Sequence, residues 1–246
     1  MLPEIAVPVF ETTLPSTGEK VKYRPYLVKE EKVLLMAHQG KDPKEVANAV
    51  KSLLRSCILT EEVAIEKLPS FDLEWLFLKI RAKSVGEIVE ARMVVPQNMC
   101  GKNKEKCLLD IQANIDKAVV KRDPEHTNKV QLNDDIGLVL SYPNMEILGE
   151  LVDAQSDNKV DSLLEVIAKC VKTVYDHDTA YQRPNYQGDW DADVKKLLDN
   201  LSHAQMEKIS KFFGTMPKVS CHVKQKCPEC GKDVERDIQG LMDFFT

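Results

Sequence analysis

The five residues Cys-Pro-Glu-Cys-Gly at positions 227–231 constrain the fold more than any other part of the sequence. Two cysteines separated by two residues form the turn known as a zinc knuckle, in which both thiolates face one ion. Pro228 presets φ, and Gly231 allows the backbone conformation that such a turn requires. The flanking stretches 219–223 and 234–238 have the period-two pattern of β-strands. The sequence therefore predicts that the knuckle forms the tip of a β-hairpin, as in zinc ribbons.

Half a tetrahedral zinc site needs a second half, and the chain offers one further pair of cysteines at 100 and 107. Their spacing is longer than that of a standard knuckle, but a loop of this length can still bring both thiols to one ion. Cys221 and His222 are nearby substitutes, of which at most one could contribute easily, because neighbouring strand residues face opposite sides. The predicted ligands of a structural zinc are Cys100, Cys107, Cys227 and Cys230.

Two other interpretations of the cysteine hairpin stay open. One is a zinc ribbon that has lost its metal and is held by packing alone. The other is an enzyme, either a thiol oxidoreductase or a metal-dependent enzyme of unknown substrate. A redox Cys-x-x-Cys of the thioredoxin type lies at a helix N-terminus, which lowers the pKa of the first thiol, whereas no helix is predicted after Cys230. A catalytic zinc would need an open position near a pocket. We therefore predict that the chain is not an enzyme.

Composition narrows the class of protein further. The 246 residues are 43% hydrophobic, enough for one large or two small cores, and the net charge of −5 comes from interspersed acids and bases. No long basic run favours nucleic acid, and no apolar stretch reaches the length of a membrane span. The N-terminus lacks the pattern of a signal peptide, so we expect a cytosolic protein whose seven cysteines are thiols or metal ligands. Cys57 and Cys170 lie in helical patterns and are expected to be buried.

Hydrophobic periodicity switches repeatedly between 3.6 and 2 along the chain, which predicts an α+β fold with helical blocks interleaved with β-hairpins. Helices are expected over 29–38, 42–57, 70–83, 145–151, 160–174 and 191–200 and from 202 onward. Asp42 and Ser202 are the expected N-caps of two of them. Strands are expected around 9–23, 87–95, 108–111 and 136–142, and 175–184 is expected to be a loop.

These elements group into five segments that we expect to fold together as one unit. The segments are an N-terminal β-hairpin (1–28), a helical block (29–85), a β region with the first cysteine pair (86–142), a second helical block (143–217), and the C-terminal Cys-x-x-Cys hairpin and tail (218–246). A loose internal repeat links two of them, because 71–111 and 205–238 both run helix, break, strand, cysteine loop and strand. Two such units could meet and pool their cysteines.

Other candidate binding residues have less specific patterns. His177 lies between two aspartates, and His126 follows Asp-Pro-Glu; both are expected in solvated turns. Tyr181, Tyr186 and Trp190 lie in a polar stretch that is either a partner-binding edge or surface cover. The C-terminal end is apolar, and it either caps the protein's own core or inserts into a partner. Its candidate partner-binding residues are Leu241, Phe244 and Phe245.

Several segments, in this order and spacing, resemble one family. They are 14–32 (LPSTGEKVKYRPYLVKEEK), 68–72 (LPSFD), 81–87 (RAKSVGE), 121–126 (KRDPEH), 216–218 (MPK), the Cys227–Gly231 turn and 240–245 (GLMDFF). Together they are similar to the baseplate hub and hub-assembly proteins of T-even-like contractile-tailed bacteriophages.

The resemblance implies a role in building the phage tail through protein–protein binding, as an assembly factor or as a hub component. It implies that the partners are other tail or baseplate hub proteins, and self-association is a further possibility; binding to nucleic acid or membrane is not expected. The expected location is the host cytoplasm during assembly, or the tail baseplate of the virion. The spacing of Cys100 and Cys107 departs from tidy knuckle spacing, so the resemblance leaves metal binding open.

Overall fold

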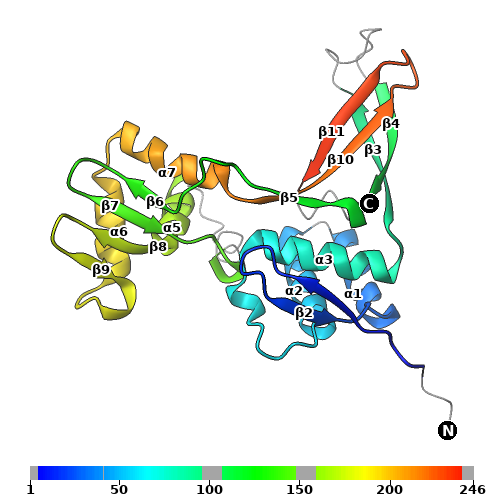
Figure 1. The fold of residues 1–246 in the computed structure, drawn as a ribbon, viewed down its shortest axis with the longest axis horizontal. Coiled ribbons are helices and arrows are strands. Elements are labelled where there is room, and N and C mark those ends of the chain that lie inside the picture. Colours follow the sequence, from blue (N-terminus) through cyan, green and yellow to red (C-terminus); the bar gives the residue numbers. More distant parts are fainter. Residues whose placement is uncertain (1–4, 41, 96–106, 148–158, 240–246) are drawn as a thin grey trace. The chain divides into compact units, whose positions relative to one another are not determined.

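The computed structural model describes residues 5–40, 42–95, 107–147 and 159–239 (Figure 1). Its contacts divide the chain into two compact units. Unit 1 combines residues 1–65, 71–121 and 218–246, and unit 2 combines 66–70 and 122–217. Both contain helices and antiparallel sheets, so the predicted α+β class is confirmed.

Unit 1 contains three helices and three antiparallel strand groupings among its described residues. Its elements are β1 (Phe10–Thr13), β2 (Lys20–Tyr23), α1 (Val28–Gly40), α2 (Pro43–Cys57), α3 (Ser70–Ser84), β3 (Ile88–Val95), β4 (Cys107–Asn114), β5 (Val119–Lys121), β10 (Lys218–Lys226) and β11 (Asp233–Gln239). β1 pairs with β2, β3 pairs with β4, and β10 lies between β11 and β5.

The first elements of unit 1 form as the sequence predicts. The turn between β1 and β2 has Gly18 at φ +78°, which a glycine adopts without strain. Asp42 caps α2 as predicted, because its carboxylate accepts a hydrogen bond from the Lys44 N–H at 2.9 Å. Backbone bonds then join β2 to the end of α2, where Arg24 N–H donates to Cys57 O at 2.9 Å.

α3 buries both apolar and acidic side chains. Leu76, Phe77 and Ile80 are fully buried, and so is Asp72, whose carboxylate accepts hydrogen bonds from the backbone N–H and hydroxyl of Ser16. Because Ser16 lies in the turn between β1 and β2, Asp72 fastens that turn to the helix. Burial raises the pKa of Glu74, also on α3, to about 7.

The raised pKa of Glu74 predicts a pH-dependent stability. Between pH 4.5 and about 7 the unfolded chain loses this proton before the folded chain does, so the free energy of unfolding falls as pH rises through that window. Glu74→Gln is expected to stabilise the protein at pH 8 by up to about 3 kcal/mol and to have little effect at pH 4. Urea unfolding at both values measures this, with the exposed Glu61→Gln as control. Equal stability of Glu74→Gln and the parent protein at pH 8 would contradict the prediction.

Unit 2 is a four-stranded antiparallel sheet packed against helices. Its elements are β6 (Lys129–Gln131), β7 (Gly137–Leu140), α5 (Lys159–Cys170), β8 (Val171–Tyr175), β9 (Ala180–Gln182), α6 (Trp190–Asp199) and α7 (His203–Thr215), with strand order β6-β7-β8-β9. Ser202 and Gln205 form the predicted capping box of α7. The core joins buried residues of the sheet, such as Leu138 and Leu140, to buried residues of the helices, such as Ile167, Val194 and Ile209.

Two predictions for unit 2 were wrong. The helix expected over 160–174 ends at Cys170, and Val171–Tyr175 forms β8, which pairs with β7 and β9. The apolar run satisfies both periods, and its β-branched second half completes the sheet. The loop expected over 175–184 contains β9, because the Asp176 carboxylate accepts hydrogen bonds from the N–H groups of Asp178 and Thr179 and so closes a hairpin turn.

Several predictions concern residues that lie partly or wholly outside the described part of the chain. The helix expected over 145–151 begins at Met145, and its residues beyond 147 lie outside the described part. The C-terminal residues Leu241, Phe244 and Phe245 also lie outside it, as does Cys100. The expectation that all segments fold together as one unit stays a prediction.

Candidate metal centre and the paired hairpins

The C-terminal cysteine turn lies at the tip of a hairpin, as predicted. β10 and β11 pair in register from Ser220 opposite Gln239 to Lys226 opposite Asp233. The turn that follows is closed by Cys227 N–H donating to Lys232 O and by Gly231 N–H donating to Cys227 O, both at 2.8 Å. Gly231 has φ +73°, in the left-handed region that favours glycine. These two hydrogen bonds and the φ of Gly231 define a tight turn at the end of the hairpin.

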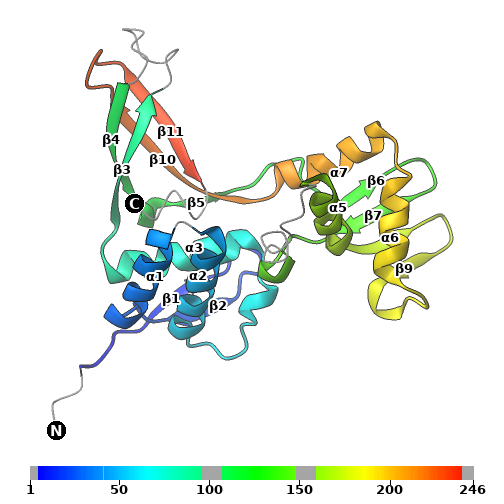
Figure 2. The same cartoon turned by 180° about the vertical axis from the view of Figure 1, so that it is seen from behind.

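A second hairpin lies beside the first one. β3 and β4 pair from Ile88 opposite Asn114 to Val95 opposite Cys107, and both views show this hairpin alongside β10 and β11 (Figures 1 and 2). Buried residues alternate along β4 at Leu109, Ile111 and Ala113, and β10 buries Val219, Ser220, Cys221 and Val223. The predicted meeting of two helix-plus-hairpin segments is therefore confirmed for their hairpins.

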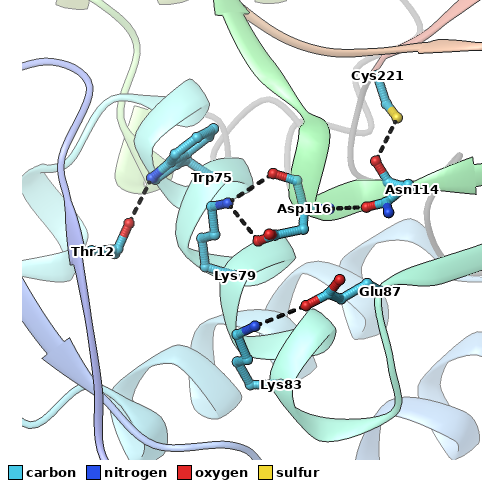
Figure 3. Close-up of polar contacts among 8 residues, drawn as sticks. All are labelled: Thr12, Trp75, Lys79, Lys83, Glu87, Asn114, Asp116 and Cys221. Carbon is cyan, nitrogen blue, oxygen red and sulfur yellow. Dashed lines mark hydrogen bonds and ion pairs between the residues drawn. The ribbon is translucent and has the colours of Figure 1, made fainter.

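One hydrogen bond sets the position of the two hairpins along each other's strand direction. The thiol of Cys221 donates to Asn114 O at 3.2 Å, at the end of β4 (Figure 3). From this contact toward the tips, β4 extends about 23 Å back to Cys107 and β10 extends about 20 Å forward to Cys227, at ~3.3 Å per residue. The backbone of Cys107 is thus expected at about the height of the knuckle.

The cysteine side chains differ in accessibility. Cys227 is buried and Cys230 is partly exposed, so the knuckle offers one thiol from the interior and one at the surface. The side chain of Cys107, like the whole of Cys100, lies outside the described residues. Within the described part, no three His, Cys, Asp or Glu side chains are grouped as metal ligands. Among the described side chains, Cys227 and Cys230 are therefore one pair of candidate ligands.

The other cysteines are structural. Cys57 and Cys170 are fully buried as predicted, and burial raises the pKa of their thiols to about 11 and about 12. Burial also raises the pKa of the Cys221 thiol, which is engaged with Asn114. Because thiolates are the reactive and metal-binding form, these three residues are poor nucleophiles and poor ligands.

Helix α3 holds the base of the β3–β4 hairpin through lysine side chains (Figure 3). Lys79 donates to the carboxylate of Asp116 at 2.9 Å and to its carbonyl at 3.2 Å, just after β4. The hydrogen bond from Lys79 lowers the pKa of the Asp116 carboxyl. Lys83 donates to Glu87 at 2.9 Å, just before β3. Both ends of the hairpin are therefore tied to one face of α3.

The same helix also contacts the N-terminal hairpin. The indole N–H of Trp75 donates to the hydroxyl of Thr12 at 3.1 Å (Figure 3). The Lys79 ammonium lies 4.7 Å from the centre of the Trp75 ring, a cation–π geometry. Trp75 thus contacts Lys79, the residue that also holds the β3–β4 hairpin through Asp116.

Lys79 is expected to contribute more to stability than Lys83. Lys79→Met removes two hydrogen bonds of a side chain that is only 15% exposed, and we expect the free energy of unfolding to fall by about 1–2 kcal/mol. Lys83→Met removes one ion pair to Glu87 from a side chain that is 30% exposed, for which about 0.5 kcal/mol is expected. Urea unfolding of the two variants tests this difference, and equal losses would be evidence against Lys79 as the anchor.

Sequence reasoning missed the environment of His126 in unit 2. Its ring stacks on Tyr142 with centroids 5.6 Å apart, and its nitrogens lie 2.9 Å from Thr215 Oγ1 and 3.0 Å from the Tyr142 hydroxyl. The Thr215 hydroxyl donates its proton to the Lys211 carbonyl, so it can only accept a hydrogen bond from His126. The neutral imidazole that satisfies both contacts donates from Nδ1 to Thr215 and accepts at Nε2 from the Tyr142 hydroxyl. Burial lowers the pKa of His126 accordingly. His177, by contrast, is exposed as expected and lies 2.7 Å from Asp135.

Comparison with known families decides the identity of the chain at the family level. The model of the T4 bacteriophage base plate protein family matches residues 7–246. The chain belongs to this family. No curated protein and no solved structure matches significantly. The matched range covers unit 2 of the base plate protein in full and unit 1 from residue 7 onward. Among the described residues no helix has the length and apolarity to cross a bilayer.

Proposed function

We propose that this base plate protein acts in assembly of the baseplate hub, as an assembly factor or as a hub component, by binding other tail proteins. The observation that carries the proposal is the family match over residues 7–246. The resemblance of the same chain to hub and hub-assembly proteins supports the finer role.

Exposed apolar side chains give this proposal a physical basis. On α1, Val28, Leu35 and Met36 are 66%, 55% and 72% exposed. At the far end of the β3–β4 hairpin, the cross-strand pair Val94 and Leu108 is half exposed on both strands. Exposed apolar side chains such as these are candidates for contact with a partner. Strand β11, not a helix, follows Cys230, so the Cys-x-x-Cys does not lie at a helix N-terminus as it does in thioredoxin-type oxidoreductases.

Infection with a phage that lacks this protein tests the role. Tails are expected to stop at an incomplete baseplate, and a plasmid copy of the chain is expected to restore them. Mass spectrometry of purified virions beside infected-cell lysate then separates the two forms of the proposal. Stoichiometric presence in virions indicates a hub component, and presence in lysate alone indicates an assembly factor. Normal tails without the protein would overturn both.

The C-terminal segment is proposed to take part in partner binding. Deletion of 240–246 removes Leu241, Phe244 and Phe245, and large apolar side chains of this kind dominate interfaces. Co-purification and circular dichroism are measured on the same deletion. A folded deletion that no longer retains tail proteins supports the proposal, and a folded deletion that assembles normally contradicts it.

We also propose that Cys227 and Cys230, together with Cys100 and Cys107, hold one structural zinc ion. The knuckle backbone at Gly231 and the burial of Cys227 fit a thiolate ligand pair. The level of β4 against β10, set by the contact of Cys221 with Asn114, fits a shared site at the hairpin tips. The ion would join the two hairpins near the ends of β4 and β10 that carry Cys107 and Cys227.

A further inference from the structure

The free edge of the sheet in unit 2 combines unpaired backbone groups with a cavity. β9 is the last strand in the order β6-β7-β8-β9, and its three residues are exposed. Asp176 N–H donates to Thr179 O at 2.9 Å, which fixes the alternation of hydrogen-bonded pairs in this hairpin. By that alternation the N–H and C=O groups of Ala180 and Gln182 point away from β8, toward the open edge.

One row of side chains crosses the sheet and ends at this edge. The register places Val130, Leu138, Val174 and Tyr181 opposite one another on four successive strands. Their burial falls along the row, since Val130 and Leu138 are buried, Val174 is partly buried and Tyr181 is 42% exposed. The core of unit 2 thus extends to β9 and is left incomplete there.

A cavity of about 310 Å³ lies where the row ends. Val174 and Tyr181 line it from the sheet, Trp190 and Leu197 from α6, and Tyr186 from the preceding turn. Its volume is at the lower end of the range of ligand pockets, roughly 300–1,000 Å³, so it has room for one large side chain. The walls are largely aromatic and apolar.

Two polar groups in the wall define what would fit. Trp190 is 7% exposed, and its indole N–H is buried without a hydrogen-bond acceptor, which costs free energy until an acceptor arrives. Asp193 accepts a hydrogen bond from the Tyr186 hydroxyl at 2.7 Å, and no described lysine or arginine forms an ion pair with it. The carboxylate of Asp193 therefore favours an occupant with a positive charge, and the buried indole N–H of Trp190 is a probe for changes at the site.

We propose that β9 binds an extended segment of another protein as a fifth strand, with one large apolar side chain in this cavity and a lysine or arginine beside Asp193. An added strand would place one side chain next to Tyr181 on the same face, where the row is incomplete. The C-terminal residues 240–246 of this chain contain Asp243 and no basic residue, and the chain as a whole is acidic, so charge favours a foreign segment over a second copy. Only the identification of the partner as a tail protein rests on the proposed function.

Synthetic strand peptides test the site on the purified full-length protein. The probe has a central phenylalanine flanked by lysines, and its two comparison peptides carry glutamates in place of the lysines or alanine in place of the phenylalanine. NMR follows the indole N–H of Trp190 and the amides of Ala180 and Gln182. We expect saturable shifts of all three with the lysine–phenylalanine peptide, in the millimolar range that is typical of a short segment. No shift, or equal binding of the phenylalanine and alanine peptides, would overturn the proposal.

Single substitutions test the apolar contact and the charge contact of the site separately. Tyr181→Ala is expected to weaken binding of the probe at least about fivefold. Asp193→Asn keeps an acceptor for Tyr186 and is expected to abolish the preference for lysine, about two- to fivefold in the parent. The exposed Asp134→Asn is the charge-matched control and should leave binding unchanged. If Asp193→Asn keeps the full lysine preference, the assigned charge contact is wrong.

Dilution of the protein without peptide tests whether a second copy of this chain occupies the edge of β9. Concentration-dependent shifts at Ala180 and Gln182 would assign the edge to a second copy and overturn the choice of a foreign segment; shifts independent of concentration support it. Because these measurements use peptides and purified protein, they can fail while the infection experiment succeeds, and the reverse also holds.

Discussion

Treatment with a strong zinc chelator is expected to lower the melting temperature of the purified protein by at least about 10 °C. A structural zinc contributes its binding free energy to folding, and several kcal/mol lost from a chain of this size shift the melting temperature by ~2–4 °C per kcal/mol. Elemental analysis of protein purified without chelators is expected to find one zinc per chain. Cys227→Ser is expected to remove the metal and to reproduce the loss of stability.

The matched control is Cys170→Ala, which changes a buried thiol in unit 2. It should lose stability through the cavity it creates but keep its zinc. Metal content far below one per chain, together with an unchanged melting temperature after chelation, would favour a hairpin held by packing alone and would refute the metal site.

Replacement of Asp72 by alanine is expected to lower the free energy of unfolding by about 3 kcal/mol. The carboxylate is fully buried and accepts two hydrogen bonds from Ser16, which is itself exposed, so the loss comes from the two charge-assisted hydrogen bonds and from the space that the carboxylate leaves in the core. The turn between β1 and β2 should loosen first. Hydrogen exchange at the amides of Leu14 and Gly18, which close this turn, is expected to accelerate.

Asp72→Asn is the conservative comparison, because its amide keeps one oxygen for the Ser16 N–H. It should lose less stability than Asp72→Ala, and Ser16→Ala should reduce the difference between them. A loss below about 1 kcal/mol in Asp72→Ala would mean that the turn is held mainly by its own backbone bonds.

Local chemistry made parts of the fold predictable from sequence. Asp42 and Ser202 were recognisable as helix caps because each pairs a short polar side chain with backbone N–H groups two or three residues later. The Cys227–Gly231 turn was recognisable because its residue types define one backbone path. These features depend on contacts close in sequence.

Features that depend on distant contacts were not recognisable. The local pattern at Val171–Tyr175 fits a helix as well as a strand, and the strand forms because β7 and β9 provide partners on both sides. The stacking of His126 on Tyr142 and Phe212 brings together residues from three parts of the chain. For the cavity at β9, the aromatic cluster at 181–190 was a visible signal, but its register against Val174 was not.

The order in which the two units appear during synthesis follows from the way the chain divides. Residues 122–217 leave the ribosome as one block, so unit 2 can close while translation continues. Unit 1 must wait for its last segment, because β10 lies in the middle of the β11-β10-β5 sheet and contacts β4. Until then β4 and β5 lack the strand that covers them. During synthesis, the segments of unit 1 that precede residue 122 are therefore expected to stay incomplete until β10 has been made.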